Sequence, residues 1–255
     1  MPRLSVSGIG VNCIFYGEEY PKDTAVVFLH GWGSNGGAFG RLLAAAGEKY
    51  FTVAPDLPGF GGSEEPKSPW GVEEYAAFTS ELVQSLGIQK VLFVVHSFGG
   101  RIAITLGAKK DLPFSIEKMI FFGAAGLKPK RGPNYYVKVY TYKLCKLLLT
   151  PFPEIKKRYQ AGKGSADYRN ASPMMKQILS KTVNTDLTPL LPAISAPTLL
   201  VWGEKDTATP LYMAKIMEKQ MQDAGLFVIQ GAGHFAFAEY PAVAVAALEN
   251  FLQKS

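Results

Sequence analysis

The chain has 255 residues, of which 47% are hydrophobic and 19% charged, and it carries a formal net charge of +6. This composition excludes a disordered or fibrous protein, and the length fits one α/β domain with room for an insertion. The sequence contains no run of about 18 apolar residues, so no transmembrane helix is predicted, and residues 1–5 lack the features of a signal peptide. Cys13 and Cys145 lie in unrelated segments without metal or redox spacing, so we expect a reduced, cytoplasmic protein.

The excess of positive charge is confined to one segment. Residues 126–195 hold 13 Lys and Arg against three acidic residues, whereas the rest of the chain holds 14 against 18. Because this segment differs so clearly from its surroundings, we interpret it as an insertion into a core formed by residues 1–125 and 196–255. No nucleic-acid recognition motif accompanies the charge, so no nucleic-acid partner is expected.

Hydrophobic patterns predict strands that alternate with helices along the chain. The expected strands are residues 4–6 and 11–16, which form a hairpin, then 25–29, 51–54, 91–95, 116–122, 198–202 and 226–229. The expected helices are residues 37–49, 72–86, a helix from 101 onward, 211–222 and 242–253. Such alternation predicts an α/β fold with a mostly parallel, eight-stranded sheet and helices on both faces.

One stretch links a buried strand directly to a helix. Residues 91–95 are apolar and largely β-branched, and Ser97 and two glycines precede a helical pattern that starts at Arg101. A turn this short strains its corner residue, projects the serine side chain beyond the carboxyl end of the sheet, and places backbone N–H groups at a helix N-terminus. The pattern is typical of a nucleophile elbow. Val95 departs from it, because the position two residues before the serine is normally glycine.

A serine nucleophile needs a base, and the base needs an acid that orients it. Of the three histidines, His96 adjoins Ser97 on the opposite side of a turning backbone, and His30 is better placed to brace loops. His234 follows the last predicted strand, at the sheet edge where Ser97 emerges. We therefore expect His234 to be the base.

The acid is expected in the loop after the penultimate strand, which offers Glu204 and Asp206. Asp206 is favoured because it stands at the far tip of the loop, just before a helix, and Glu204 is the alternative. Asp56 follows an inner strand and is expected to cap its own Pro-Gly turn. The sequence thus predicts Ser97, Asp206 and His234 as the catalytic residues.

Along the chain, the nucleophile comes first, the acid second and the base last. With this order, the chain resembles the α/β-hydrolase superfamily over nearly its whole length. The motifs that carry the resemblance are residues 30–32 (His-Gly-Trp), 56–63 (Asp-Leu-Pro-Gly-Phe-Gly-Gly-Ser), 97–100 (Ser-Phe-Gly-Gly), 203–206 (Gly-Glu-Lys-Asp) and 233–234 (Gly-His). The resemblance implies that the backbone N–H groups of Trp32 and Phe98 form the oxyanion hole. It also implies that residues 126–195 form a helical cap. No cofactor and no metal are expected.

The serine at the elbow restricts the chemistry. Relatives that act on haloalkanes or epoxides carry an aspartate there, so Ser97 indicates attack on a carbonyl and acyl transfer. We therefore expect a serine hydrolase that cleaves a carboxylic ester, with a small-molecule acyl substrate. A thioesterase, a C–C bond hydrolase and a cofactor-free perhydrolase would use the same residues and are alternatives. A ligand-binding receptor with little turnover is an alternative of another class.

The cap is expected to be a mobile lid over Ser97. Its apolar helical face is expected to roof the acyl pocket and consists of Val137, Tyr140, Leu144, Leu147 and Leu148. The expected pocket residues are His30, Tyr140, Leu144 and Phe235. In the alternative interpretation, the basic and aromatic-rich cap meets anionic substrates or makes peripheral contact with lipid headgroups. The sequence does not predict an oligomeric state.

Overall fold

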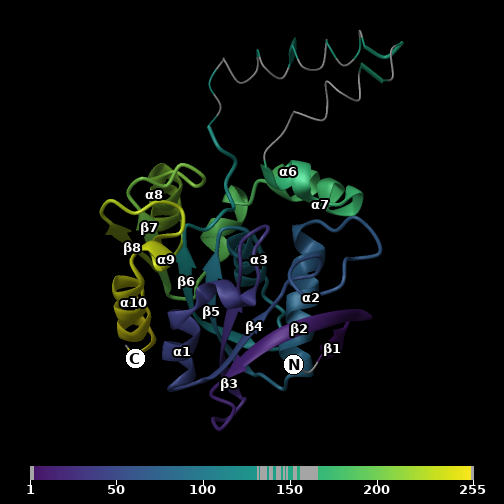
Figure 1. The fold of residues 1–255 in the computed structure, drawn as a ribbon. Helices are drawn as coiled ribbons and strands as arrows, with labels where there is room; N and C mark the ends of the chain where they lie inside the picture. The colour runs from purple at the N-terminus through teal and green to yellow at the C-terminus, as the bar shows by residue number, and fades with distance from the viewer. Residues whose placement is uncertain are drawn as a thin grey trace.

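An eight-stranded sheet forms the centre of the computed structural model, which describes residues 3–130 and 166–253 together with 132, 137, 140–141, 145, 147, 149–151 and 154–155 (Figure 1). The strands are β1 (Arg3–Val6), β2 (Ile9–Tyr16), β3 (Thr24–Leu29), β4 (Phe51–Pro55), β5 (Lys90–His96), β6 (Ser115–Phe122), β7 (Thr198–Gly203) and β8 (Ala224–Ile229). Their order across the sheet is β1-β2-β4-β3-β5-β6-β7-β8. The β1–β2 and β2–β4 pairings are antiparallel and the others are parallel, which confirms the predicted sheet.

Helices cover both faces of this sheet (Figure 1). On one face lie α1 (Arg41–Gly47), α9 (Ala236–Glu239) and α10 (Pro241–Gln253), whose buried side chains share one apolar cluster with the sheet. On the other face, a larger cluster joins the sheet to α2 (Val72–Ser85), α3 (Phe98–Gly107) and α8 (Leu211–Gln220). Because both faces are covered, the central strands are buried along almost their whole length, as their continuous apolar runs predict.

Two local features differ from the sequence prediction. The helix expected over residues 37–49 is divided into a 3₁₀ helix, η1 (Gly36–Phe39), and α1, because Gly40 between them has a φ of 49°. The short helix α9 was not expected. Elsewhere the predicted strands and helices agree with the structure to within a few residues at each end, except that α3 already begins at Phe98.

The described part of the basic segment 126–195 contains α6 (Ala166–Asn170), α7 (Pro173–Val183) and the 3₁₀ helix η2 (Thr188–Ala193). In Figure 1, α6 and α7 lie above α2 and α3. Met175 and Ile178 of α7 belong to the larger apolar cluster, and Lys181 forms an ion pair with Glu74 of α2 at 3.3 Å. The C-terminal part of the segment is therefore packed on the core. That residues 126–195 as a whole form a cap stays a prediction, because most of residues 131–165 lie outside the described part.

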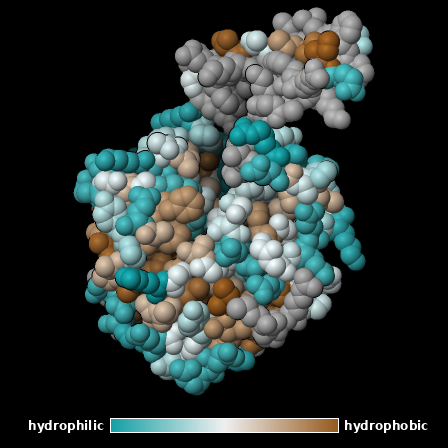
Figure 2. Space-filling model, viewed as in Figure 1, coloured by the Kyte–Doolittle hydropathy of each residue, from teal (hydrophilic) through white to brown (hydrophobic). Residues whose placement is uncertain are grey.

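The surface of the molecule, viewed as in Figure 1, carries both hydrophilic and hydrophobic residues (Figure 2). Hydrophilic residues form most of its periphery, and hydrophobic residues show mainly nearer the centre (Figure 2). No helix in the described part of the chain has the length and apolarity needed to cross a membrane.

Candidate active site

Ser97 occupies the corner between β5, which ends at His96, and α3, which begins at Phe98. Its φ of 46° and ψ of −107° lie in a region that L residues rarely adopt. Within the described residues, Ser7 is the other non-glycine residue with a positive φ. The strained corner predicted from the sequence is therefore present.

Close packing behind the corner explains the two glycines that follow the serine. A Cβ atom on Gly99 would overlap the carbonyl oxygen of Leu29, and one on Gly100 would overlap the Cβ of Ala124. Both positions therefore need glycine for α3 to approach the sheet. Val95, at the position where the elbow pattern has glycine, is fully buried in the same apolar cluster as Leu29.

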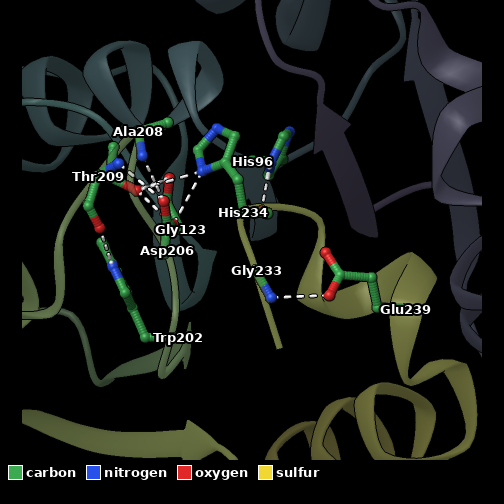
Figure 3. Close-up of polar contacts among 9 residues, drawn as sticks. All are labelled: His96, Gly123, Trp202, Asp206, Ala208, Thr209, Gly233, His234 and Glu239. Carbon is green, nitrogen blue, oxygen red and sulfur yellow. Dashed lines mark hydrogen bonds and ion pairs between the residues drawn. The ribbon is translucent and has the colours of Figure 1, made fainter. Parts of the chain in front are cut away.

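Asp206 and His234 form a hydrogen-bonded pair, although 28 residues separate them in the sequence (Figure 3). The Oδ2 atom of Asp206 lies 2.9 Å from Nδ1 of His234, and the carboxylate is fully buried. Asp206 belongs to the loop after β7, and His234 to the loop after β8. Glu204, the alternative acid, is exposed and accepts a hydrogen bond from the backbone N–H of Gly231 instead.

Hydrogen bonds keep Asp206 in its charged form. Burial acts to raise the pKa of this carboxyl, but hydrogen bonds from His234 and Thr209 outweigh burial and hold the pKa below its usual value. The backbone N–H groups of Ala208 and Thr209 both donate to Oδ1 at 2.9 Å. The carboxylate is therefore available to accept a hydrogen bond from a protonated Nδ1 of His234.

Thr209 supports the pair and was missed in the sequence analysis. Its hydroxyl lies 2.7 Å from Oδ2 of Asp206 and 3.0 Å from the carbonyl oxygen of Gly123 (Figure 3). Its own carbonyl accepts from the indole N–H of Trp202 at 2.6 Å. The sequence signal was available, because a threonine three residues after an aspartate often caps its loop. Gly123 leaves room for the pair, since a Cβ there would lie 3.0 Å from Oδ2 of Asp206.

The other two histidines, His30 and His96, are buried and hydrogen-bonded to backbone groups. The Nε2 atom of His30 accepts from the backbone N–H of Leu57 at 2.9 Å, which braces two loops as expected. The ring of His96 lies 4.7 Å from the ring of His234, and its Nε2 lies 3.2 Å from the carbonyl oxygen of His234. Burial is the main cause that lowers the pKa of His30 to about 4 and that of His96 to about 3. Both rings are therefore neutral at pH 7.

Asp56 holds its own loop and a neighbouring loop together, instead of capping the Pro-Gly turn as expected. Its carboxylate accepts hydrogen bonds from the backbone N–H of Gly62 at 2.8 Å and from that of Gly36 at 2.7 Å. The carboxylate is thus committed to the loops next to the site.

A cavity of about 280 Å³ opens beside Ser97. Its walls come from the loop after β3, the elbow, the loop after β6, α7 and the segment from 208 to 213; the lining residues are Trp32, Ser97, Phe98, Arg101, Ala125, Leu127, Pro129, Leu179, Thr182, Val183, Ala208, Thr209 and Met213. Ser97 and the Thr209 that holds Asp206 therefore face the same space. Among the described residues, no hydrogen bond joins the Ser97 hydroxyl to His234 in this structure.

The residues expected from the sequence to line the pocket do not contribute to this cavity or lie outside the described residues. His30 is 1% exposed and is enclosed by its hydrogen-bond partners. Tyr140 is 65% exposed and Phe235 is 49% exposed, and neither lines the cavity. Leu144 lies outside the described residues. Within segment 126–195, the cavity is lined instead by Leu127 and Pro129 and by Leu179, Thr182 and Val183 of α7.

Trp32 and Phe98, the residues whose backbone N–H groups the resemblance assigns to an oxyanion hole, both line the cavity. Phe98 is the first residue of α3, and Trp32 lies in the loop after β3, with its ring 5.5 Å from the ring of Phe98. Within the described part of the chain, neither N–H donates to a protein acceptor. Both N–H groups are therefore available as donors, and that of Phe98 lies at the N-terminus of α3.

Over the described residues, no group of three or more His, Cys, Asp or Glu side chains has the arrangement of a metal site. The described residues supply a strained serine at a cavity, a hydrogen-bonded histidine–aspartate pair and two backbone N–H groups without a protein acceptor. These are the parts that nucleophilic acyl transfer requires.

Comparison with known proteins agrees with this fold. The model of the alpha/beta hydrolase family matches residues 26–248, so the chain belongs to the alpha/beta hydrolase family. The resemblance inferred from the motifs is thereby confirmed, and the protein is a hydrolase by family.

Individual relatives are distant. The chain is 25% identical to the 2-(acetamidomethylene)succinate hydrolase of Mesorhizobium japonicum, over 98% of this chain and 94% of the relative. It is 25% identical to the pimeloyl-[acyl-carrier protein] methyl ester esterase of Aeromonas hydrophila, over 92% and 98%. The solved structure of a bacterial membrane phospholipase A superposes with a TM-score of 0.78 at 22% identity, covering 98% of this chain and 84% of that one, which shows the shared fold.

Proposed function

We propose that the protein is a serine hydrolase that cleaves a carboxylic ester through an acyl-enzyme, with Ser97 as nucleophile, His234 as base and Asp206 as the acid that orients it. The observation that carries the proposal is the strained serine at the cavity. Its φ of 46° places the side chain in a space that also holds Thr209, the residue hydrogen-bonded to Asp206. A conformation this costly persists where the surrounding structure enforces it, as at a nucleophile.

In the first half-reaction, Nε2 of His234 takes the hydroxyl proton of Ser97 while the oxygen attacks the ester carbonyl carbon. Asp206 accepts a hydrogen bond from Nδ1 of His234 at 2.9 Å and stabilises the imidazolium that forms. The negative charge moves to the former carbonyl oxygen, where the backbone N–H groups of Trp32 and Phe98 stabilise it. The C–O bond then breaks, and His234 returns the proton to the departing alcohol.

In the second half-reaction, water replaces the alcohol. His234 removes a proton from the water, the resulting hydroxide attacks the acyl carbon, and the bond to Ser97 breaks as the serine oxygen takes the proton back. The product is a carboxylic acid, and the enzyme returns to its starting protonation state. No cofactor enters this balance.

An ester is favoured over the other acyl substrates because of the distant relatives. One of them is named as a methyl ester esterase, and it aligns with 92% of this chain. A receptor without turnover is disfavoured because such a protein needs no hydrogen-bonded Asp206–His234 pair.

The experiment is covalent labelling with a fluorophosphonate, followed by hydrolysis assays with short 4-nitrophenyl esters. Ser97→Ala should abolish labelling and lower kcat by about 10⁴-fold or more, because the three residues act as a unit. Ser7→Ala is the matched control, since Ser7 also has a positive φ but lies in the β1–β2 turn, hydrogen-bonded to Glu81. Undiminished turnover in Ser97→Ala would contradict the proposal.

A further inference from the structure

Arg101 is the single charged residue among those that line the described cavity. It lies on α3, four residues after Ser97, which corresponds to one turn and a rise of about 6 Å. Arg101 and Ser97 both line the cavity, so a ligand in it lies next to both residues.

The Arg101 side chain is buried but only partly bonded. The residue is 5% exposed, and one guanidinium nitrogen, Nη1, donates to the carbonyl oxygen of Thr185 at 2.8 Å. No carboxylate of the described residues lies within ion-pair distance of it, although Asp186 is close enough to act on it electrostatically. The remaining nitrogens have no acceptor in the described part of the chain, and none is both unpaired and sealed from solvent. The unpaired nitrogens are therefore accessible to solvent, and Arg101 is one of the residues that line the cavity.

A buried cation that no carboxylate pairs with directly is costly unless a ligand supplies the pair. A guanidinium has five N–H donors in a planar fork that matches a carboxylate, and a single backbone carbonyl uses one of them. If the role of Arg101 were only to attach the end of α7 to α3, a neutral donor would serve the same carbonyl without the desolvation cost. The unused donors and the uncharged remainder of the cavity wall point to an anionic ligand.

We propose that Arg101 binds a carboxylate on the acyl part of the substrate, so that the preferred esters are monoesters of short dicarboxylic acids. This inference rests on the proposed function, because it assigns the substrate class of the same site. Ser97 attacks the ester carbonyl at one end of the acyl chain, and the free carboxylate at the other end pairs with the guanidinium. The apolar walls, among them Leu127, Leu179 and Met213, enclose the methylene groups between them.

The test compares monomethyl adipate with methyl hexanoate, in which a methyl group replaces the free carboxylate, and follows acid release in a pH-stat. The ratio of the two kcat/KM values should favour monomethyl adipate in the wild type. In Arg101→Gln, which removes the charge but keeps an N–H donor for Thr185, the ratio should fall by about 10- to 100-fold, as expected for a charged hydrogen bond. A purely structural role would change both substrates together and leave the ratio unaltered.

Lys215→Gln is the matched control, because it removes one positive charge from the exposed side of α8. Its ratio should equal that of the wild type. The wild-type ratio should also change little between about 0.05 and about 0.5 M salt, because a buried pair is weakly screened. A ratio that collapses with salt would overturn the proposal and assign the preference to surface lysines.

Binding separates this inference from the proposed function. Calorimetry of monomethyl adipate with Ser97→Ala should show binding that weakens about tenfold or more when Arg101→Gln is added. If esters are turned over through Ser97 but the ratio is the same in Arg101→Gln, the carboxylate inference is wrong and the hydrolase proposal stands. If no ester is turned over while binding still depends on Arg101, the hydrolase proposal fails and the anion site stands. Binding that ignores Arg101→Gln overturns the anion site.

Discussion

His30 joins two loops of the site, and it does so only as a neutral ring. Its Nδ1 lies 2.7 Å from the carbonyl oxygen of Gly31, and its Nε2 lies 2.9 Å from the backbone nitrogen of Leu57. These partners assign the proton to Nδ1, which donates, and leave Nε2 as the acceptor. Protonation of Nε2 would place two N–H groups against each other. We therefore predict that acid destabilises the fold through this residue.

The size of the effect follows from the pKa in the two states. Burial is the main cause that lowers the pKa of His30 to about 4, although the Gly31 carbonyl and the charge of Asp56 act in the opposite direction. In the unfolded chain the pKa is about 6.5. Since the unfolded state takes up the proton first, the stability that neutral His30 provides is complete above pH 6.5. It is lost as the pH falls toward 4, with no further loss below that value.

One proton corresponds to about 1.4 kcal/mol per pH unit, so His30 should lower the free energy of unfolding by about 2 kcal/mol between pH 7.5 and pH 5. His96, whose pKa burial lowers to about 3, should contribute a similar amount over the same interval. Together the two rings should account for about 4 kcal/mol, a large part of the total stability of a typical domain.

The assay is urea unfolding of the wild type and of His30→Gln at pH 7.5 and pH 5. The glutamine oxygen can still accept from Leu57, but the side chain does not titrate. The variant should lose about 2 kcal/mol less than the wild type between the two pH values. For each protein the quantity compared is the change in the free energy of unfolding between pH 7.5 and pH 5. The destabilisation that the substitution itself causes at pH 7.5 therefore cancels, and so does the titration of carboxylates that both proteins share. An unchanged pH dependence in His30→Gln would refute the reasoning.

Three further predictions concern the site. Asp206→Asn should fold normally and lose about 10⁴-fold in kcat, because the imidazole would favour the wrong tautomer, whereas Glu204→Gln should have little effect; the reverse result would reassign the acid. Thr209→Val removes one hydrogen bond to Asp206 and should lower kcat by about 5- to 30-fold. The loss of that bond should also raise the pKa of Asp206 and move the acid side of the pH–rate profile to higher pH. An acid side that stays at the wild-type pH would exclude the positioning role of Thr209. Gly31→Ala would place a Cβ 2.7 Å from Nδ1 of His96, and we expect about a 10²-fold lower kcat/KM for short esters, with wild-type activity contradicting the close approach.

The sequence by itself determined the strands, most of the helices and the elbow. Each depends on a local pattern, because a buried parallel strand needs a continuous apolar run, and a strand that turns into a helix at Ser97 needs small residues behind the corner. The parallel alternation also placed the ends of the strands at one edge, so the loops of Asp206 and His234 were expected to meet there. For the same reason, the order of the motifs along the chain was enough to infer the family resemblance.

Only the tertiary structure decided which side chains within those loops meet. Asp206 contacts His234 while Glu204 turns outward to Gly231, a choice made by the path of the loop and by hydrogen bonds from Thr209. Arg101 was visible in the sequence merely as the residue where the helical pattern starts. Its burial depends on how α3 packs beneath α7, and the two helices are more than 60 residues apart in the chain. Contacts across such distances depend on the shape of the whole fold, which no local pattern records.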